Sequence, residues 1–324
     1  MKLCLKLCLR RFAIEKMDIS SLDTIVFSGG GVRGLSYSGV LLAFKDTYGI
    51  SISEHFKTFA GTSVGAFFAL ACAISVEVSE ALEAFRQIGL ESIFAKDPTW
   101  LLTNFALNNG DALKSLVVTI LASKKIPAGI TMGELYMKTG KTLVVTVVDM
   151  LTSAVLYLDH TNEGRDMPVV NAIMGSMALP PLFPPIRHTV GSTQLLMMDG
   201  GLLDTFPLSK FDRAKTLGLR TSWYIDGSPI TDISNYYTRI LSILQLSMHS
   251  IQNTVTETYP FVIFIDLDPI RSDDSSIDPN ELVFKGYRAA ITRFASANSK
   301  PFSEVPTKFL SDKPVPLPAY LTKK

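Results

Sequence analysis

The chain has 324 residues, of which 47% are hydrophobic and 19% are charged, and its formal net charge at pH 7 is +1. This length supplies one large domain or two small ones, and the balanced charge gives no reason to expect a nucleic-acid partner. The three cysteines, Cys4, Cys8 and Cys72, form no disulfide framework, which favours a reducing, cytoplasmic compartment. No Cys/His cluster has the spacing of a zinc site, so no metal is expected.

Leucines occupy alternate positions near the start of the N-terminal tail, residues 1–16, which also contains basic residues. Lys6 interrupts the apolar stretch and the basic pair Arg10 and Arg11 follows it, so the order is not that of a signal peptide. The pattern suits a weak interfacial membrane anchor. A disordered tail, or an extension ahead of a start at Met17, is the alternative.

The first predicted strand, residues 23–28, runs directly into the glycine-rich turn Gly29–Gly34 and then into a helix over residues 35–44. The turn satisfies the Gly-x-Gly-x-x-Gly pattern of a dinucleotide site, but the next strand does not end in the acidic residue that such a site needs. Consecutive glycine N–H groups at a helix N-terminus can instead stabilise a developing oxyanion. Arg33 would orient this loop or bind an anionic headgroup, and an ordinary salt bridge is the alternative.

The pattern Gly-x-Ser-x-Gly, residues 61–65, lies between a predicted buried strand over residues 56–60 and a predicted buried helix over residues 66–74. A serine on a tight strand-to-helix turn is a nucleophile elbow, which makes Ser63 a candidate nucleophile. Gly61 and Gly65 are required because the backbone is strained and passes close to its neighbours. The alternative is a small-residue helix N-terminus packed against a sheet.

The following segments alternate between helical and extended patterns. Lys141–Asp149 is β-branched and apolar, as a central parallel strand should be. The proline-rich apolar segment 178–185 suits the wall of an apolar pocket, or a packed connector. The remaining predicted elements are mixed helices over 76–122 with breaks at 97–98 and 108–110, a short helix at 131–137, a hairpin strand at 154–158 and a helix at 169–177.

A further buried strand, residues 195–198, ends in Asp199-Gly200-Gly201. A carboxylate followed by two glycines at a strand end is typical of a site residue and equally of a plain Asp-Gly turn. Strands alternating with helices imply a mostly parallel sheet with helices on both faces. The last predicted elements are strands at 220–225 and 260–267, helices at 237–255 and 281–294, and an irregular proline-containing end.

The glycine turn, the serine elbow and the Asp-Gly-Gly turn, with Ser176–Pro180 as a fourth block, resemble the patatin-like phospholipase family over roughly residues 24–217. The resemblance implies a three-layer α/β/α fold with a mostly parallel central sheet. It makes Ser63 the nucleophile and Asp199 its base, without metal or cofactor. It assigns the oxyanion hole to Gly29, Gly30, Gly31, Val32, Arg33 and Gly34, and the elbow and turn glycines to Gly61, Gly65, Gly200 and Gly201.

The chain departs from the family at Asp204–Pro207, where the family usually has Asn-x-Pro, and this puts in doubt what orders the turn that holds Asp199. By resemblance, residues 23–220 are the catalytic domain, preceded by a tail over residues 1–22 and followed by residues 221–324, which complete or flank it. The expected activity is hydrolysis of fatty-acyl esters of phospholipids or other lipids at a membrane surface, by a cytoplasmic protein that is peripheral to membranes.

Two alternatives to this function stay open. One is a catalytically silent lipid-binding or scaffold protein that keeps the fold. The other is a Ser-His-Asp esterase, which needs a histidine as base. His188 precedes Asp199 in the chain, and His249 falls inside a predicted helix, so neither has the setting of an α/β-hydrolase histidine.

Overall fold

A computed structural model describes residues 17–222, 229–232, 236, 239–240, 242–243, 252–271 and 273–294. Four features expected from the sequence lie wholly or largely outside the described residues. These are the tail over 1–16, the end of the strand expected at 220–225, most of the helix expected at 237–255 with His249, and the proline-containing end.

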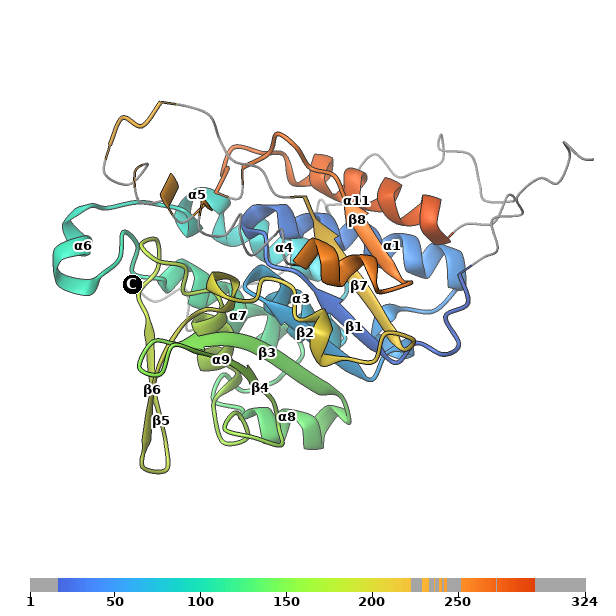
Figure 1. Ribbon diagram of the computed structural model, residues 1–324, viewed down its shortest axis with the longest axis horizontal. Coiled ribbons are helices and arrows are strands. Elements are labelled where there is room, and N and C mark those ends of the chain that lie inside the picture. The colour runs from blue at the N-terminus through green and yellow to red at the C-terminus, as the bar shows by residue number, and fades with distance from the viewer. Residues whose placement is uncertain are drawn as a thin grey trace, which may run out of the picture.

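Among the described residues, eight strands form one mixed sheet (Figure 1). Its centre is five adjacent parallel strands, in the spatial order β3, β2, β1, β7, β8, which confirms the mostly parallel sheet. The parallel strands are β1 (Thr24–Phe27), β2 (Thr58–Thr62), β3 (Thr142–Asp149), β7 (Thr216–Thr221) and β8 (Val262–Ile265). The antiparallel strands are β4 (Ala154–Leu158), β5 (Ile186–Val190) and β6 (Thr193–Asp199).

The pairing of β3 decides how two distant parts of the chain meet. Residues 147–149 of β3 pair with both β4 and β6, so these two strands lie on opposite edges of β3. Residues 145 and 146 pair with both β4 and β2, so β2 also lies on the edge opposite β4. Strands β2 and β6 therefore follow one another along the same edge of β3, and their ends, Thr62 and Asp199, meet there.

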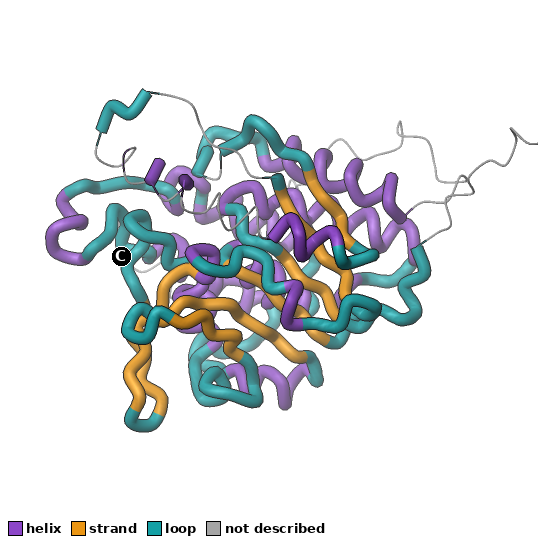
Figure 2. The backbone as a smooth tube through the Cα atoms, in the orientation of Figure 1, coloured by secondary structure: helices purple, strands orange, loops and turns teal. Residues whose placement is uncertain are grey.

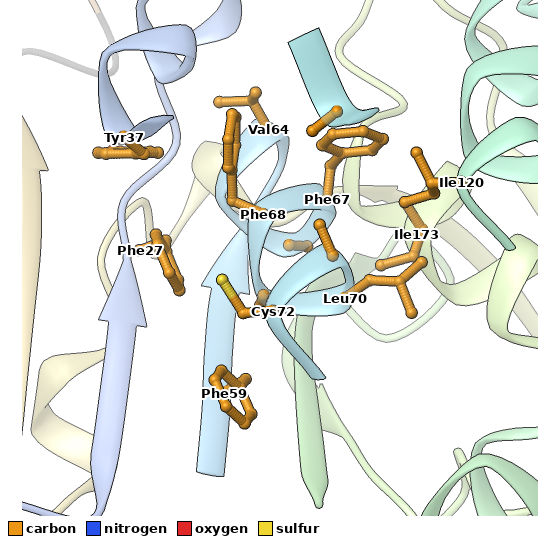
Figure 3. Packing of buried hydrophobic residues seen from close by; sticks show 14 of the residues in the cluster. Phe27, Tyr37, Phe59, Val64, Phe67, Phe68, Leu70, Cys72, Ile120 and Ile173 are labelled. Carbon is orange, nitrogen blue, oxygen red and sulfur yellow. The ribbon is translucent and has the colours of Figure 1, made fainter. Parts of the chain in front are cut away.

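Helices and connecting segments cover both faces of this sheet. The larger core lies on the face of Ile25, Phe27 and Phe59, and α3 is buried along its whole length there (Figure 3). On the other face, Val26 and Ala60 pack against residues from 206–211 and 255–262. The helices are α1 (Ser36–Tyr48), α2 (Ile52–His55), α3 (Val64–Ala73), α4 (Val78–Ile88), α5 (Leu90–Ile93), α6 (Thr99–Asn104), α7 (Asp111–Ser123), α8 (Met132–Thr139), α9 (Val169–Ser176) and α11 (Pro279–Phe294), with short 3₁₀ turns η1 (Gly31–Leu35), η2 (Gly200–Leu202) and η3 (Leu208–Lys210).

The hairpin that contains β5 differs from the sequence-based expectation. Strand β5 was not expected, and it forms with β6 a hairpin that projects from the body of the molecule (Figure 2). Its side chains are half-buried or exposed, so its hydrophobic signal is weak. The mixed helices expected over 76–122 are α4, α5, α6 and α7, and the breaks expected at 97–98 and 108–110 lie before and after α6. No helix among the described residues has both the length and the apolar character that crossing a bilayer requires.

Candidate active site

Ser63 sits on the tight turn between β2 and α3, with φ 57° and ψ −128°. Backbone in this region is strained for a residue with a side chain and is found where a function requires it. A Cβ atom on Gly61 would lie 2.3 Å from the backbone of Gly65, and one on Gly65 would lie 2.4 Å from the carbonyl oxygen of Phe27. Both glycines are therefore required by close backbone contacts, as the elbow pattern predicts.

A second serine, Ser176 at the end of α9, fixes the elbow from outside the motif. The Ser63 backbone N–H donates to Ser176 Oγ over 2.9 Å, and that hydroxyl donates to the Thr146 carbonyl oxygen over 2.6 Å. Ser176 is completely buried, so no water competes for these bonds. Sequence reasoning identified Ser176 only as part of a motif block, because its contacts join three elements that are far apart in the chain.

Asp199 ends β6 beside the elbow and is only 2% exposed. Its backbone N–H donates to the Ala178 carbonyl oxygen over 3.1 Å, and its Oδ1 accepts the Gly201 N–H over 2.7 Å. Burial raises the pKa of the Asp199 carboxyl to about 7, while hydrogen bonds from the Ser63 hydroxyl and the Gly201 N–H act in the opposite direction. A carboxyl with this pKa can accept a proton from the adjacent hydroxyl near neutral pH.

Asp204 holds the turn that follows Asp199. Its N–H donates to the Gly200 carbonyl oxygen over 2.8 Å, and its own carbonyl oxygen accepts the Thr62 hydroxyl over 3.0 Å. Its carboxylate accepts the Tyr157 hydroxyl over 2.7 Å and the Gln252 amide over 3.1 Å. The turn after Asp199 is thus ordered in this chain, because the backbone carbonyl of Asp204 ties it to β2 and the Asp204 carboxylate ties it to β4.

The glycine-rich turn supplies fewer free donors than its sequence suggests. The Gly29 N–H donates to the Thr205 carbonyl oxygen over 2.9 Å, and the Arg33 N–H donates to the Gly30 carbonyl oxygen over 3.3 Å. Among the described residues, the backbone N–H groups of Gly30, Gly31 and Val32 have no acceptor. The six residues expected to form an oxyanion hole therefore reduce to three available donors.

The two remaining residues of this turn have structural roles. The Arg33 side chain is 1% exposed and donates to the carbonyl oxygens of Gly30 and Ser222, the latter over 2.7 Å. Burial lowers the pKa of this guanidinium to about 10. Arg33 thus orients the loop and cannot reach a lipid headgroup. A Cβ atom on Gly34 would lie 2.5 Å from the Val64 side chain, so Gly34 allows η1 to pack against α3.

A pocket with about 840 Å³ of empty space, open solvent at its mouth included, contains Ser63 and Asp199 together with Gly30 and Val32. The proline-rich segment forms part of its wall, as its composition suggested. Ten hydrophobic side chains besides Val32 and Val64 line it: Leu35, Phe85, Leu90, Ile93, Phe94, Leu113, Met177, Leu179, Leu182 and Phe183.

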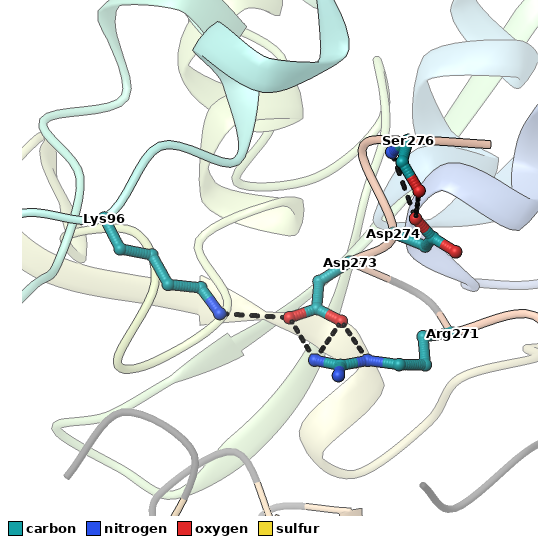
Figure 4. A network of polar contacts seen from close by, with 5 residues as sticks. All are labelled: Lys96, Arg271, Asp273, Asp274 and Ser276. Atoms are coloured by element: carbon teal, nitrogen blue, oxygen red, sulfur yellow. Dashed lines mark hydrogen bonds and ion pairs between the residues drawn. The ribbon is translucent and has the colours of Figure 1, made fainter. Parts of the chain in front are cut away.

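Asp273 is the other acidic residue in the pocket lining. Lys96 Nζ lies 3.1 Å from its Oδ2, and the Arg271 guanidinium lies 3.0 Å from its Oδ1 (Figure 4). Burial raises the pKa of the Asp273 carboxyl, but the two cations outweigh burial and lower it. Asp273 therefore stays ionised and joins the segment before α6 to the segment before α11.

A family model for patatin-like phospholipases matches residues 25–212, which is more than half of the chain. The protein belongs to the patatin-like phospholipase family. The matched region contains the elbow, the glycine-rich turn and the Asp-Gly-Gly turn.

Three similar proteins illustrate the range of this patatin-like family. The chain is 23% identical over 267 residues to the uncharacterised protein YqhO of Bacillus subtilis, covering 77% of this chain and 89% of YqhO. It is 26% identical over 197 residues to a cGAMP-activated phospholipase of Pseudomonas aeruginosa, covering 58% of this chain and 55% of that protein. The crystal structure of VipD from Legionella pneumophila superposes with a TM-score of 0.49 at 17% identity, covering 85% of this chain and 67% of VipD.

The described histidines of this patatin-like chain lie away from the pocket. His55 Nε2 contacts the Ile19 carbonyl oxygen at 2.8 Å, and the His160 ring stacks on Tyr136 with 3.7 Å between ring centroids. His188 lies on β5, and none of these three lines the pocket. In the same described part of the chain, no group of three His, Cys, Asp or Glu residues is arranged to hold a metal ion.

Proposed function

We propose that the protein is a phospholipase of the A type, which cleaves fatty-acyl esters of phospholipids through an acyl-serine intermediate on Ser63. The observation that carries this proposal is the meeting of the Ser63 hydroxyl and the buried Asp199 carboxylate at an apolar pocket. Membership of the patatin-like phospholipase family supports it, as does similarity to a probable lipid hydrolase of invertebrate iridescent virus 6, 26% identical over 191 residues.

The proposed reaction begins when Ser63 Oγ attacks the ester carbonyl carbon while Asp199 takes the hydroxyl proton. The tetrahedral intermediate then collapses, the ester C–O bond breaks, and Asp199 gives the proton to the departing lysophospholipid oxygen. A water molecule next attacks the acyl-serine while Asp199 accepts a proton from it. The bond between the acyl carbon and Ser63 Oγ then breaks, and Asp199 returns the proton to Oγ. The products are a free fatty acid and a lysophospholipid, and the serine is restored.

The free N–H groups of Gly30, Gly31 and Val32 are the proposed oxyanion donors. They lie at the N-terminus of η1 in the pocket that contains Ser63, where charge develops on the former carbonyl oxygen. Each donor of this kind contributes about 10²–10³ in rate. The loop is held in position by the buried Arg33 side chain and by the Gly29 N–H bond to Thr205.

The pocket wall favours a fatty-acyl chain as the group that is cleaved. Each methylene that an acyl chain buries contributes about 0.8 kcal/mol to binding. The side chains that form the wall are hydrophobic and suit the apolar surface of such a chain. Lipid esters should therefore be hydrolysed faster than short-chain esters of the same alcohol.

The test is release of fatty acid from phospholipid, lysophospholipid and triacylglycerol by wild type, Ser63→Ala and the matched control His188→Ala. Loss of a serine nucleophile costs about 10⁶ in rate, so folded Ser63→Ala should be inactive while His188→Ala stays within about tenfold of wild type. More than a few per cent of activity in Ser63→Ala would overturn the nucleophile. An inactive His188→Ala or His249→Ala would favour a triad, and an inactive wild type would favour the scaffold alternative.

A further inference from the structure

Helix α6 carries large apolar side chains on the outside of the molecule. Trp100 is 37% exposed and Phe105, directly after the helix, is 71% exposed. Phe105 also has φ 58°, a left-handed conformation that is unusual for an aromatic residue. The segment projects at one end of the molecule, beyond the layers that cover the sheet (Figure 1). Two exposed aromatic residues, one of them on strained backbone, call for a partner that covers them.

The chemistry of this projection fits a lipid–water interface. Residues 99–110 contain no Asp, Glu, Lys or Arg, so the projection can enter a headgroup layer without taking a charge out of water. Tryptophan and other amphipathic aromatic residues favour that layer. The charges that flank it are Asp111 and, at its base, Asp97, which accepts the Thr99 N–H over 2.9 Å, and Lys96, which pairs with Asp273 over 3.1 Å. The base therefore has no excess of positive charge that would require anionic lipid.

The base of the projection is fixed to the wall of the substrate pocket. The Asp97 N–H donates to the Leu107 carbonyl oxygen, and the Leu107 N–H donates to the Pro181 carbonyl oxygen over 2.7 Å. The Asn108 amide donates to the carbonyl oxygen of Ala95 over 2.8 Å. Ile93 and Phe94 on one side of these bonds, and Leu182 and Phe183 on the other, line the pocket. Apolar surface thus lies on both sides of the point where the projection is attached.

We propose that residues 99–105 form a membrane-insertion tip that enters the surface of a phospholipid bilayer and holds the pocket mouth against it. A lipid could then pass its acyl chain from the bilayer to Ser63 along apolar surface. The occupant is a bilayer and not a protein because the tip is uncharged and its base is hydrogen-bonded to a segment that lines a pocket suited to acyl chains. The biological purpose of the tip rests on the proposed phospholipase function, but the test of membrane binding does not require hydrolysis.

The binding test uses the full chain with Ser63→Ala, so that the vesicles stay intact, and with Trp223→Phe, so that Trp100 is the single tryptophan. With phosphatidylcholine vesicles in 0.5 M NaCl, Trp100 emission should shift to shorter wavelength and be quenched by brominated lipid. High salt screens any attraction through the basic tail, leaving apolar insertion as the cause of binding. If vesicles leave the Trp100 emission unchanged, the proposal is overturned, and a protein partner becomes the favoured occupant of the tip.

The matched variants are Phe105→Asn and Phe264→Asn. Asparagine tolerates the left-handed backbone of residue 105, and Phe264 is another exposed aromatic residue, 54% exposed on β8. Phe105→Asn should weaken vesicle partition at least about tenfold, because the variant loses the burial of a large aromatic side chain in the apolar layer. Phe264→Asn should leave partition within about twofold of the parent. Equal partition of the two variants would overturn the proposal.

Activity separates this inference from the proposed function. With Ser63 restored, Phe105→Asn should hydrolyse a soluble short-chain ester as wild type does and hydrolyse vesicle phospholipid more slowly. Vesicle insertion without any hydrolysis would refute the phospholipase and leave the tip intact. If Phe105→Asn hydrolyses vesicle phospholipid as fast as wild type does, the membrane-insertion tip is refuted and the proposed phospholipase activity still stands.

Discussion

Replacing Asp199 by asparagine should have opposite effects on activity and on stability, because the substitution removes a base and also a buried charge. Burial raises the pKa of this carboxyl from its ordinary 3.8 to about 7. Each factor of ten in a protonation equilibrium corresponds to 1.36 kcal/mol, so the ionised carboxylate costs about 4 kcal/mol of folding free energy above pH 7. The activity should fall by about 10⁴ or more because no base remains.

The sign of the pH dependence follows from which state holds the proton. The unfolded chain ionises this carboxyl near pH 3.8, while the folded protein keeps its proton up to about pH 7. As the pH rises from about 4 to about 7, the contribution of Asp199 therefore lowers the wild-type free energy of unfolding. Above about pH 7 this contribution is constant. Asp199→Asn lacks this contribution. Its gain over wild type should be near zero at pH 4 and reach up to about 4 kcal/mol at pH 8.

Urea denaturation followed by circular dichroism at pH 4, 6 and 8 measures this gain. Asp149→Asn is the matched control, since Asp149 is also 2% exposed. Burial raises the pKa of Asp149 as well, but hydrogen bonds from Thr152, Leu196 and Leu151 outweigh burial and lower it. The control should therefore lose stability at pH 8. A loss of stability in Asp199→Asn at pH 8, or a gain that does not change with pH, would refute the reasoning.

Two further predictions concern the base and the turn behind it. For a soluble ester, kcat/KM should rise with pH up to about 7 and level off above it, because Asp199 must be ionised to accept the serine proton. A kcat/KM that is flat from about pH 5 to pH 9 would contradict the role of Asp199 as base. Asp204→Asn should stay within about threefold of wild type in ester hydrolysis, because its amide oxygen still accepts the Phe206 and Gln252 donors and its NH₂ can donate to the Tyr157 oxygen. Asp204→Ala leaves those donors unpaired and should lose about 2 kcal/mol of stability in thermal unfolding, so equal melting temperatures for the two variants would contradict this account.

Local sequence rules account for the strands that carry the site. The strand expected over 141–149 is observed over Thr142–Asp149, because a β-branched apolar run admits one dominant conformation. The elbow and the Asp-Gly-Gly turn were both expected at strand ends and both lie there. Strand β5 was missed because its half-exposed side chains carry little hydrophobic contrast. The helix expected over 35–44 continues to Tyr48, where Gly49 ends it in a left-handed conformation.

By itself, the sequence determined which residues have the right chemistry: a serine on a strained elbow, a carboxylate at a strand end and a row of glycine amides. Only the tertiary structure decided which of them act together. It placed β6 beyond the end of β2 on one edge of β3, buried Asp199 enough to raise its pKa, and engaged the Gly29 amide with Thr205. The physical reason is that pairing edges, burial and hydrogen-bond partners depend on residues that are far apart in the chain, whereas periodicity and turn patterns report only on neighbours.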